Sequence, residues 1–172
     1  MCLELLSRNP RTRTQLATAL QKRGVPDGVA GAVLGRFAEV GLIDDAAFAR
    51  AWVESRHHSR GLAKSMLAVE LQQRGVEPED VQAAVGTLGP DEEIETARRL
   101  VAKRVAATRG RPLPSRVRQL VGMLARKGYP ASLAYRIVRE ALEEDIPNSE
   151  TPRVDRLRLE ALDLAAAEDD PC

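Results

Sequence analysis

Residues that could build a disulfide framework, a metal centre or an aromatic core are almost absent from this sequence. The two cysteines, Cys2 and Cys172, lie at opposite ends of the chain, and no group of Cys and His residues has the spacing of zinc ligands. Aromatic residues account for only 3% of the sequence, so the core must be built from leucine, valine and alanine. We therefore expect a protein of a reducing compartment that holds no metal and no cofactor.

Long apolar runs and phosphate-binding loops are also missing. No run approaches the roughly 20 apolar residues of a membrane span, and no charged segment precedes a short apolar one as in a secretory signal. These absences favour a soluble, cytoplasmic protein. Because the sequence has neither a Walker-type loop nor a G-x-G-x-x-G motif after a strand, we expect no enzyme activity.

The few polar residues of catalytic or metal-binding type have simpler explanations. His57 and His58 are adjacent, so on a helix they point about 100° apart and cannot share a metal, and we expect both to be exposed. Asp44 and Asp45 precede an amphipathic segment, where a helix needs a side chain that accepts its first amide protons. We interpret this pair as N-caps, since the segment supplies no further oxygen ligands for a cation.

The stretch from 41 to 75 shows the pattern on which the chain is organised. Phe48 and Trp52 are four residues apart, and so are Leu67 and Leu71 after a break, which places each pair on one face of a helix. The stretch is therefore predicted to be a helix, a turn and a second helix. All four residues are predicted to lie in the core, with a stacking role for Trp52 as the less favoured alternative.

The end of that second helix occurs three times along the chain. The sequence around Gly24, Gly75 and Gly128 is LQKRGVP, LQQRGVEP and LARKGYP, and these glycines are 51 and 53 residues apart. Leucines lie eight and four residues before each glycine, and in the last copy these are the predicted core residues Leu120 and Leu124. Each glycine fits the left-handed C′ position of a Schellman cap. A period of this size indicates a helical array.

The repeat divides the chain into segments. We place helical repeats at 1–41, 42–90 and 91–146, with a short or truncated first helix in the first repeat. A second apolar stripe follows each glycine, and we assign equivalent positions to Val29 and Val33, to Val81 and Val85, and to Leu133 and Ile137. Residues 147–172 are predicted to be a linker and a tail that forms a lone helix or stays disordered.

With these motifs the sequence resembles the RecX family. The resemblance rests on GLIDDAAFARAWVESR, on RGLAKSMLAVELQQRGV and on RLVGMLARKGYPASLAYRIVREAL, and it covers about residues 2–146. It implies an all-α protein whose three tandem three-helix repeats form an elongated, curved helical array. The abbreviated first helix and the tail depart from the family's pattern.

The resemblance also implies a function, in DNA recombination, DNA repair and the SOS response. RecX proteins bind the groove of RecA filaments on single-stranded DNA and suppress ATP hydrolysis, strand exchange and co-protease activity. They have no catalytic residues of their own. The implied partner is the RecA filament, with or without direct contact to its single-stranded DNA, and we expect a monomer that binds no membrane.

Charge is distributed unevenly, although the formal net charge is only +1. The three predicted repeats carry +3, −2 and +4 and the tail −4, and the stretch from 96 to 139 contains twelve Lys and Arg residues but no Asp or Glu. Such a stretch favours contact with phosphates, because neutralising them releases condensed counterions. The alternative is that these cations are solvated helix faces and caps, which we prefer for Arg74, Arg126 and Lys127.

The candidate filament- and DNA-binding residues lie on the central and third repeats: Arg56, Arg60, Lys64, Arg98, Arg99, Lys103, Arg104, Arg109, Arg111, Arg116 and Arg118. A competing hypothesis is a helix-turn-helix-like DNA-binding module that acts without RecA, since arginine-rich units of this kind can enter a groove. Against it, no helix carries an evident set of Asn, Gln and Arg that would read bases, and aromatic platforms for single strands are scarce.

Overall fold

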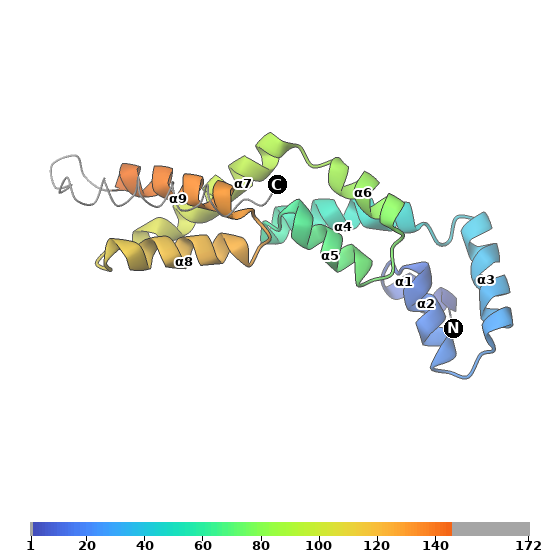
Figure 1. The fold of residues 1–172 in the computed structure, drawn as a ribbon. Helices are drawn as coiled ribbons and strands as arrows, with labels where there is room; N and C mark the ends of the chain where they lie inside the picture. The colour runs from blue at the N-terminus through green and yellow to red at the C-terminus, as the bar shows by residue number, and fades with distance from the viewer. Residues whose placement is uncertain (1, 146–172) are drawn as a thin grey trace. The chain divides into compact units, whose positions relative to one another are not determined.

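The part of the chain that the computed structural model describes, residues 2–145, is entirely helical (Figure 1). It contains nine α-helices, one short 3-10 helix and no strand, which confirms the predicted all-α class. The elements are α1 (Cys2–Arg8), α2 (Arg13–Gln21), α3 (Asp27–Glu39), α4 (Asp45–Arg60), α5 (Lys64–Gln72), α6 (Pro78–Gly86), α7 (Pro90–Val105), η1 (Ala106–Thr108), α8 (Leu113–Ala125) and α9 (Ala131–Asp145). The predicted linker and tail, 147–172, lie outside the described residues.

The helices belong to two compact units. Among the described residues, unit 1 takes 2–60 and 65–88, and unit 2 takes 61–64 and 89–145. Unit 1 therefore contains α1 to α4, α6 and all of α5 except its first residue. Unit 2 contains α7 to α9 together with the short segment that leads into α5. The three-helix repeats follow one another in tandem, as predicted.

The second helix of each repeat ends in the same hydrogen-bond pattern. Gly24, Gly75 and Gly128 have φ values of 75°, 72° and 89°. The amide of the residue after each glycine donates to the carbonyl of the leucine five residues before it, at 3.2 Å in all three copies. The glycine amide itself donates to the carbonyl three residues earlier, at 2.9 Å. These two bonds define a Schellman motif, and the left-handed backbone explains why glycine recurs at this position.

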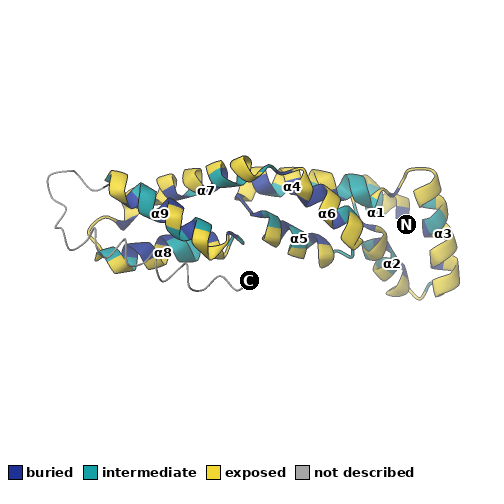
Figure 2. Cartoon of the chain, turned by 45° about the horizontal axis from the view of Figure 1, so that its top comes forward, coloured by how far each residue is buried: buried dark blue, intermediate teal, exposed yellow. Residues whose placement is uncertain are grey.

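The leucines that precede each glycine contribute to the cores of the units. The two leucines of α2, the two of α5 and the two of α8 that share this spacing are each at most 5% exposed: Leu16, Leu20, Leu67, Leu71, Leu120 and Leu124. Buried and exposed residues alternate along the helices, with the period of a helix that has one apolar face (Figure 2).

The apolar stripe of α3 is displaced by one residue from the predicted one. Ala30 and Leu34 are buried, whereas Val29 and Val33 are 54% and 38% exposed. The buried valines of α6 lie at the same distance from their own cap glycine as Ala30 and Leu34 do from Gly24. The prediction aligned valine with valine, but the distance from the cap sets the register of the following helix.

The buried face of α4 also differs from the predicted one. Ala49, Val53 and His57 are buried, while Phe48 and Trp52 are only half-buried. Helix α4 packs against α6, and small side chains permit the close approach of two helices. Phe48 and Trp52 instead stack on each other, with ring centroids 5.7 Å apart. His57 is thus buried rather than exposed, and the two aromatic rings are not core residues.

The adjacent aspartates cap two different helices within unit 1. The carboxylate of Asp44 accepts a hydrogen bond from the Ala47 amide at 2.7 Å, which makes Asp44 the N-cap of α4. The carboxylate of Asp45 accepts the amide of Arg13, the first residue of α2, at 2.9 Å. Asp45 therefore supplies a cap to the preceding repeat and contributes to the contact between the first two repeats.

Two hydroxyl groups complete this contact, which we term the first joint (residues 12–14, 45 and 74–75). Thr12 donates to the carbonyl of Arg74 at 2.6 Å, and Thr14 donates to the carbonyl of Gly75 at 3.0 Å. Thr12 also accepts the amide of Gln15 as the N-cap of α2. The start of α2 is thereby bonded to two carbonyls of the turn that follows α5.

Unit 2 contains an equivalent contact, the second joint (residues 61–64, 93 and 127–129). The amide of Lys64, which begins α5, donates to the Glu93 carboxylate at 2.8 Å. The amide of Ala63 donates to the carbonyl of Lys127 at 2.9 Å, and the buried hydroxyl of Tyr129 donates to the carbonyl of Gly61 at 3.1 Å. In both joints, a carboxylate receives the first amide of a helix, and the carbonyl before a cap glycine receives a second donor.

Candidate functional site

The basic residues of α7 do not form one surface. All four are exposed, but Arg98 and Arg99 point about 100° apart around the helix, and Arg104 points about 140° from Arg99. Lys103 lies about 40° from Arg99 and shares its side of the helix. Arg99 donates to the hydroxyl of Thr96 at 3.0 Å. Neither Lys103 nor Arg104 has an ion-pair partner in the described part of the chain.

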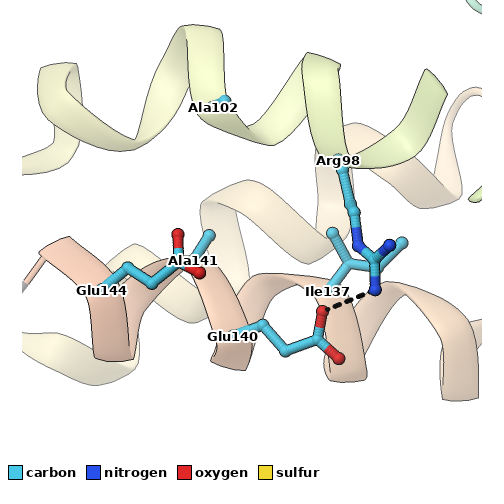
Figure 3. Close-up of a pocket in the computed structure, with 6 residues that line it drawn as sticks. All are labelled: Arg98, Ala102, Ile137, Glu140, Ala141 and Glu144. Carbon is cyan, nitrogen blue, oxygen red and sulfur yellow. Dashed lines mark hydrogen bonds and ion pairs between the residues drawn. The ribbon is translucent and has the colours of Figure 1, made fainter. Parts of the chain in front are cut away.

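Arg98 is engaged by α9. Its Nη2 lies 3.3 Å from Oε2 of Glu140, and the two side chains point toward each other across a hollow of about 130 Å³ (Figure 3). The hollow is also lined by Ala102, Ile137, Ala141 and Glu144. This volume is smaller than the roughly 300 Å³ at which small-molecule sites begin, so Arg98 connects α7 to α9 and lines no ligand cavity of ordinary size.

Arg116 is buried, which corrects its assignment to the contact surface. Its Nη2 lies 2.5 Å from Oδ2 of Asp145, and its Nε donates to the hydroxyl of Thr108 at 2.9 Å. Arg109 pairs with the other oxygen of the same carboxylate. The hydrogen bonds from Arg109 and Arg116 hold the pKa of Asp145 below its ordinary value, although burial opposes them. The structure therefore gives Arg116 a structural role.

Two further predicted residues of the third repeat remain on the surface. Arg111 lies in the link between η1 and α8, and Arg118 lies on α8; both are exposed and have no ion-pair partner within residues 2–145. We refer to Arg99, Lys103, Arg104, Arg111 and Arg118 together as the unit 2 cations.

In unit 1, three arginine side chains lie next to the indole of Trp52 or the carboxylate of Glu70. The indole N–H of Trp52 donates to Oε2 of Glu70 at 2.9 Å, and Nη1 of Arg60 lies 3.2 Å from Oε1 of Glu70. The guanidinium carbons of Arg56 and Arg74 lie 4.2 and 3.7 Å from the Trp52 ring centroid, at cation–π distance. We refer to these five residues as the Trp52 cluster.

The place of Arg74 in this cluster is not predicted from the sequence. The position before a cap glycine favours positive charge through the helix dipole, so the sequence predicts only a cap residue there. In the structure, Nη1 of Arg74 donates to the carbonyl of Glu70 at 2.7 Å. Burial lowers the pKa of Arg74; the charge of Glu70 opposes this shift, and that of Arg56 adds to it. No sequence signal predicts that Trp52, on another helix, lies beneath this side chain.

Two further residues from the sequence analysis, Lys64 and Cys2, are at least partly buried in the fold. Lys64 is half-buried at the start of α5, where its amide belongs to the second joint. Cys2 is a buried free thiol.

Within residues 2–145, no three His, Cys, Asp or Glu side chains are placed to hold a metal ion. No helix in this range combines the length and the apolar character needed to cross a bilayer.

The architecture places the protein in the class of all-α proteins built from tandem three-helix repeats. Three family models match it in order: the first three-helix domain of RecX matches residues 1–37, the second 44–85 and the third 91–138. The chain therefore belongs to the RecX family.

Relatives named "Regulatory protein RecX" support this membership. The one from Thermobifida fusca (strain YX) is 61% identical over 145 residues, which cover 84% of this chain and 78% of the relative. The one from Streptomyces coelicolor is 56% identical over 150 residues, or 87% of this chain and 80% of the relative.

A solved structure, that of RecX from Lactobacillus salivarius, has the same fold. It superimposes with a TM-score of 0.74 at 16% identity and covers 82% of this chain and 92% of its own. A second structure, of a regulatory protein RecX, has a TM-score of 0.72 at 24% identity and covers 81% of this chain and 68% of its own.

Proposed function

We propose that this protein is a non-enzymatic regulator of RecA, mainly an inhibitor, that acts in the cytoplasm as a monomer. In this proposal it lies in the groove of RecA filaments on single-stranded DNA and suppresses ATP hydrolysis, strand exchange and co-protease activity. Family membership supports the regulatory role. The unit 2 cations are the observation that carries the contact with the filament.

Most of the unit 2 cations are free to meet phosphates, although they do not lie on one face of α7. Lys103, Arg104, Arg111 and Arg118 are exposed and have no ion-pair partner in the described range, so their charge is available to an incoming anion. Each phosphate that such a residue neutralises releases condensed counterions and strengthens binding. We retain the division into repeats 1–41, 42–90 and 91–146 and assign the main contact to the third.

The first experiment measures ATP hydrolysis by RecA on single-stranded DNA with the protein added below one molecule per RecA. We expect inhibition by the wild type. The triple variant Lys103→Glu, Arg104→Glu, Arg118→Glu should need at least about tenfold more protein for the same inhibition, because three favourable contacts become repulsive. Circular dichroism should show unchanged helicity, since all three side chains are exposed.

A matched control separates position from total charge. Lys22→Glu, Arg36→Glu, Arg50→Glu changes the net charge equally, at exposed positions of unit 1. Inhibition by this control should stay close to that of the wild type. If both triple variants lose inhibition equally, the contact is one of overall charge and not of the unit 2 cations. Absence of inhibition by the wild type at every stoichiometry would refute the proposed function.

Binding to bare DNA distinguishes the competing function. A DNA-binding module that acts without RecA should bind tightly and sequence-selectively in the absence of RecA, and its binding should resist added salt. A gel-shift series over several salt concentrations measures this. We expect weak, salt-sensitive binding without sequence preference, as phosphate contacts alone produce.

A further inference from the structure

The Trp52 cluster has more positive charge than its own carboxylate neutralises. Glu70 is its only acid, and both carboxylate oxygens are already occupied, one by Arg60 and the other by the indole of Trp52. Arg56 has no ion-pair partner among the described residues, and the hydrogen bond donated by Arg74 goes to a backbone carbonyl. Two guanidinium groups therefore retain donors for an external anion.

These two guanidinium groups are held in place before any ligand arrives. Both lie over the Trp52 ring, at 4.2 Å for Arg56 and 3.7 Å for Arg74. The guanidinium of Arg74 is also anchored by its Nη1 bond to the Glu70 carbonyl, and the backbone of Arg74 is fixed where its carbonyl accepts the Thr12 hydroxyl. Long side chains normally lose rotamer freedom on binding, so this immobilisation lowers the entropic cost.

The two charges are also close enough to oppose each other. Burial lowers the pKa of Arg74 and the positive charge of Arg56 adds to this shift, but arginine stays protonated nonetheless. An anion that bridges the two groups would relieve this repulsion and could accept bidentate hydrogen bonds from each planar fork.

We propose that Arg56 and Arg74, positioned by Trp52, bind the phosphodiester backbone of single-stranded DNA. The proposal rests on the proposed function in that it names a direct DNA contact for a regulator of filaments on single-stranded DNA. Arg56 and Arg74 are half-buried against the Trp52 ring. Guanidinium planes held in this way favour a single strand over an acidic peptide, because bases can stack on the planes while the N–H groups meet phosphates. Arg56 and Arg74 are the binding residues, and Trp52 is a positioning residue.

The third repeat lacks this arrangement at the equivalent place. Asp45 and Glu93 have the same role in the two joints, so the position that matches Trp52 on α7 is Leu100. Leu100 packs against Gly61, where an added Cβ would meet its side chain at 2.9 Å. The variant Trp52→Leu therefore removes the platform and introduces the residue that the other repeat uses.

Trp52 is the only tryptophan of the chain, so intrinsic fluorescence reports on this cluster alone. The full-length protein is titrated with an oligothymidylate, and binding is measured in parallel by anisotropy of a fluorescein-labelled oligothymidylate. We expect the emission of Trp52 to change with the same saturation curve as the anisotropy. Polyglutamate serves as the second probe, because it offers carboxylates without bases or phosphates.

Variants assign the effect to the two arginines. Arg56→Gln and Arg74→Gln should each raise the Kd for the labelled oligothymidylate about three- to tenfold and reduce the slope of log K against log salt by about 0.7, the value for one phosphate of a single strand. Trp52→Leu should weaken binding similarly. Arg50→Gln, on the same helix and exposed, is the matched control and should leave Kd and slope unchanged. Equal melting temperatures show that folding is intact.

Several results would overturn the inference. These are no measurable binding of the wild type, no loss of affinity or slope in the two arginine variants, or binding of polyglutamate as tight as that of the oligothymidylate, which would indicate an acidic protein partner. RecA ATPase assays on the same samples separate this outcome from the proposed function. If the wild type inhibits RecA and the variants bind DNA as tightly as the wild type, the proposed DNA site is wrong and the proposed function stands. If the variants lose DNA binding as expected but the wild type does not inhibit RecA, the proposed function is wrong and the DNA site stands.

Discussion

Unit 1 and unit 2 each contain a carboxylate that collects two side chains, but the two carboxylates are buried to different depths. Glu70 in unit 1 binds Trp52 and Arg60 and is 17% exposed, with Arg60 itself 53% exposed. Asp145 in unit 2 binds Arg109 and Arg116 and is 5% exposed, with Arg116 at 9%. Arg116 is therefore part of the core of unit 2, whereas Arg60 is exposed and Arg56 and Arg74 are half-buried.

The two units are otherwise built on the same joint. In each, the first amide of a helix donates to an acid of the next repeat, and the carbonyl before a cap glycine accepts a donor from the preceding repeat. This backbone arrangement is therefore compatible with different surroundings. The position of Trp52 supports a charged cluster in one unit, and the equivalent Leu100 packs against a glycine in the other.

Breaking the buried pair of unit 2 should have the largest effect. Asp145→Asn leaves the buried Arg116 without a counter-charge, which typically costs about 3 kcal/mol or more of unfolding free energy. The same change in unit 1, Glu70→Gln, should cost about 1 kcal/mol or less, because Arg60 is solvated. Urea denaturation of both variants measures the difference. Equal losses would show that the depth of the carboxylate is unimportant.

The same pair predicts a pH dependence. The folded-state pKa of Asp145 lies below its ordinary value of 3.8, so its stabilisation is fully present above pH 3.8 and is lost as the pH falls through the folded-state pKa. Unfolding curves of the wild type should therefore move closer to those of Asp145→Asn in strong acid. A constant gap between the two proteins at every pH would contradict this assignment.

The second largest effect should come from the cap glycine of the first joint. Gly75→Val is strained by the φ of 72°, and its Cβ would lie 2.5 Å from Thr14, so we expect a loss of about 3 kcal/mol. Gly24→Val is the matched control, because φ is 75° and no atom lies within 4 Å of an added Cβ. It should lose only the strain, about 1–2 kcal/mol. Thermal unfolding of both variants tests whether the joint, and not the cap alone, requires glycine.

The smallest effect is expected at Asp45, where the pH dependence has the opposite sign. Burial raises its pKa above the ordinary value of 3.8, so its contribution to stability decreases as the pH rises from 3.8 through the folded-state pKa. Asp45→Asn keeps an oxygen acceptor for the Arg13 amide and removes the charge, so stability at pH 7 should change by at most about 0.5 kcal/mol. Asp45→Ala, which removes the acceptor, should cost about 1 kcal/mol. Equal losses in the two variants would show that the charge matters more than the hydrogen bond.

Features that depend on neighbours along the chain were predictable. The three glycine caps follow from glycine's access to positive φ and from leucines at fixed distances before it. The all-α class follows from the helical period of the apolar residues, and Asp44 follows from the need for an N-cap. The buried stripe of α3 was also predictable, because Ala30 and Leu34 lie as far from Gly24 as the buried valines of α6 lie from Gly75.

The environments of individual charged and aromatic side chains were not predictable. Arg116 and Arg118 are two residues apart on α8, and both looked like contact residues, yet one is buried against Asp145 and the other is exposed. Likewise, Trp52 has the spacing of a core residue, but α4 turns its alanine and valine face inward. Asp45 looked like a cap of its own helix and instead caps α2.

The helices, their ends and their threefold recurrence follow from the local sequence, because hydrogen bonds and backbone angles in these elements involve residues at most a few positions apart. The packing of the helices fixes which arginines are paired, which lie over Trp52 and which face solvent. The reason is physical: burial and Coulomb energy depend on distances between side chains of different helices, and those distances exist only after the helices have packed.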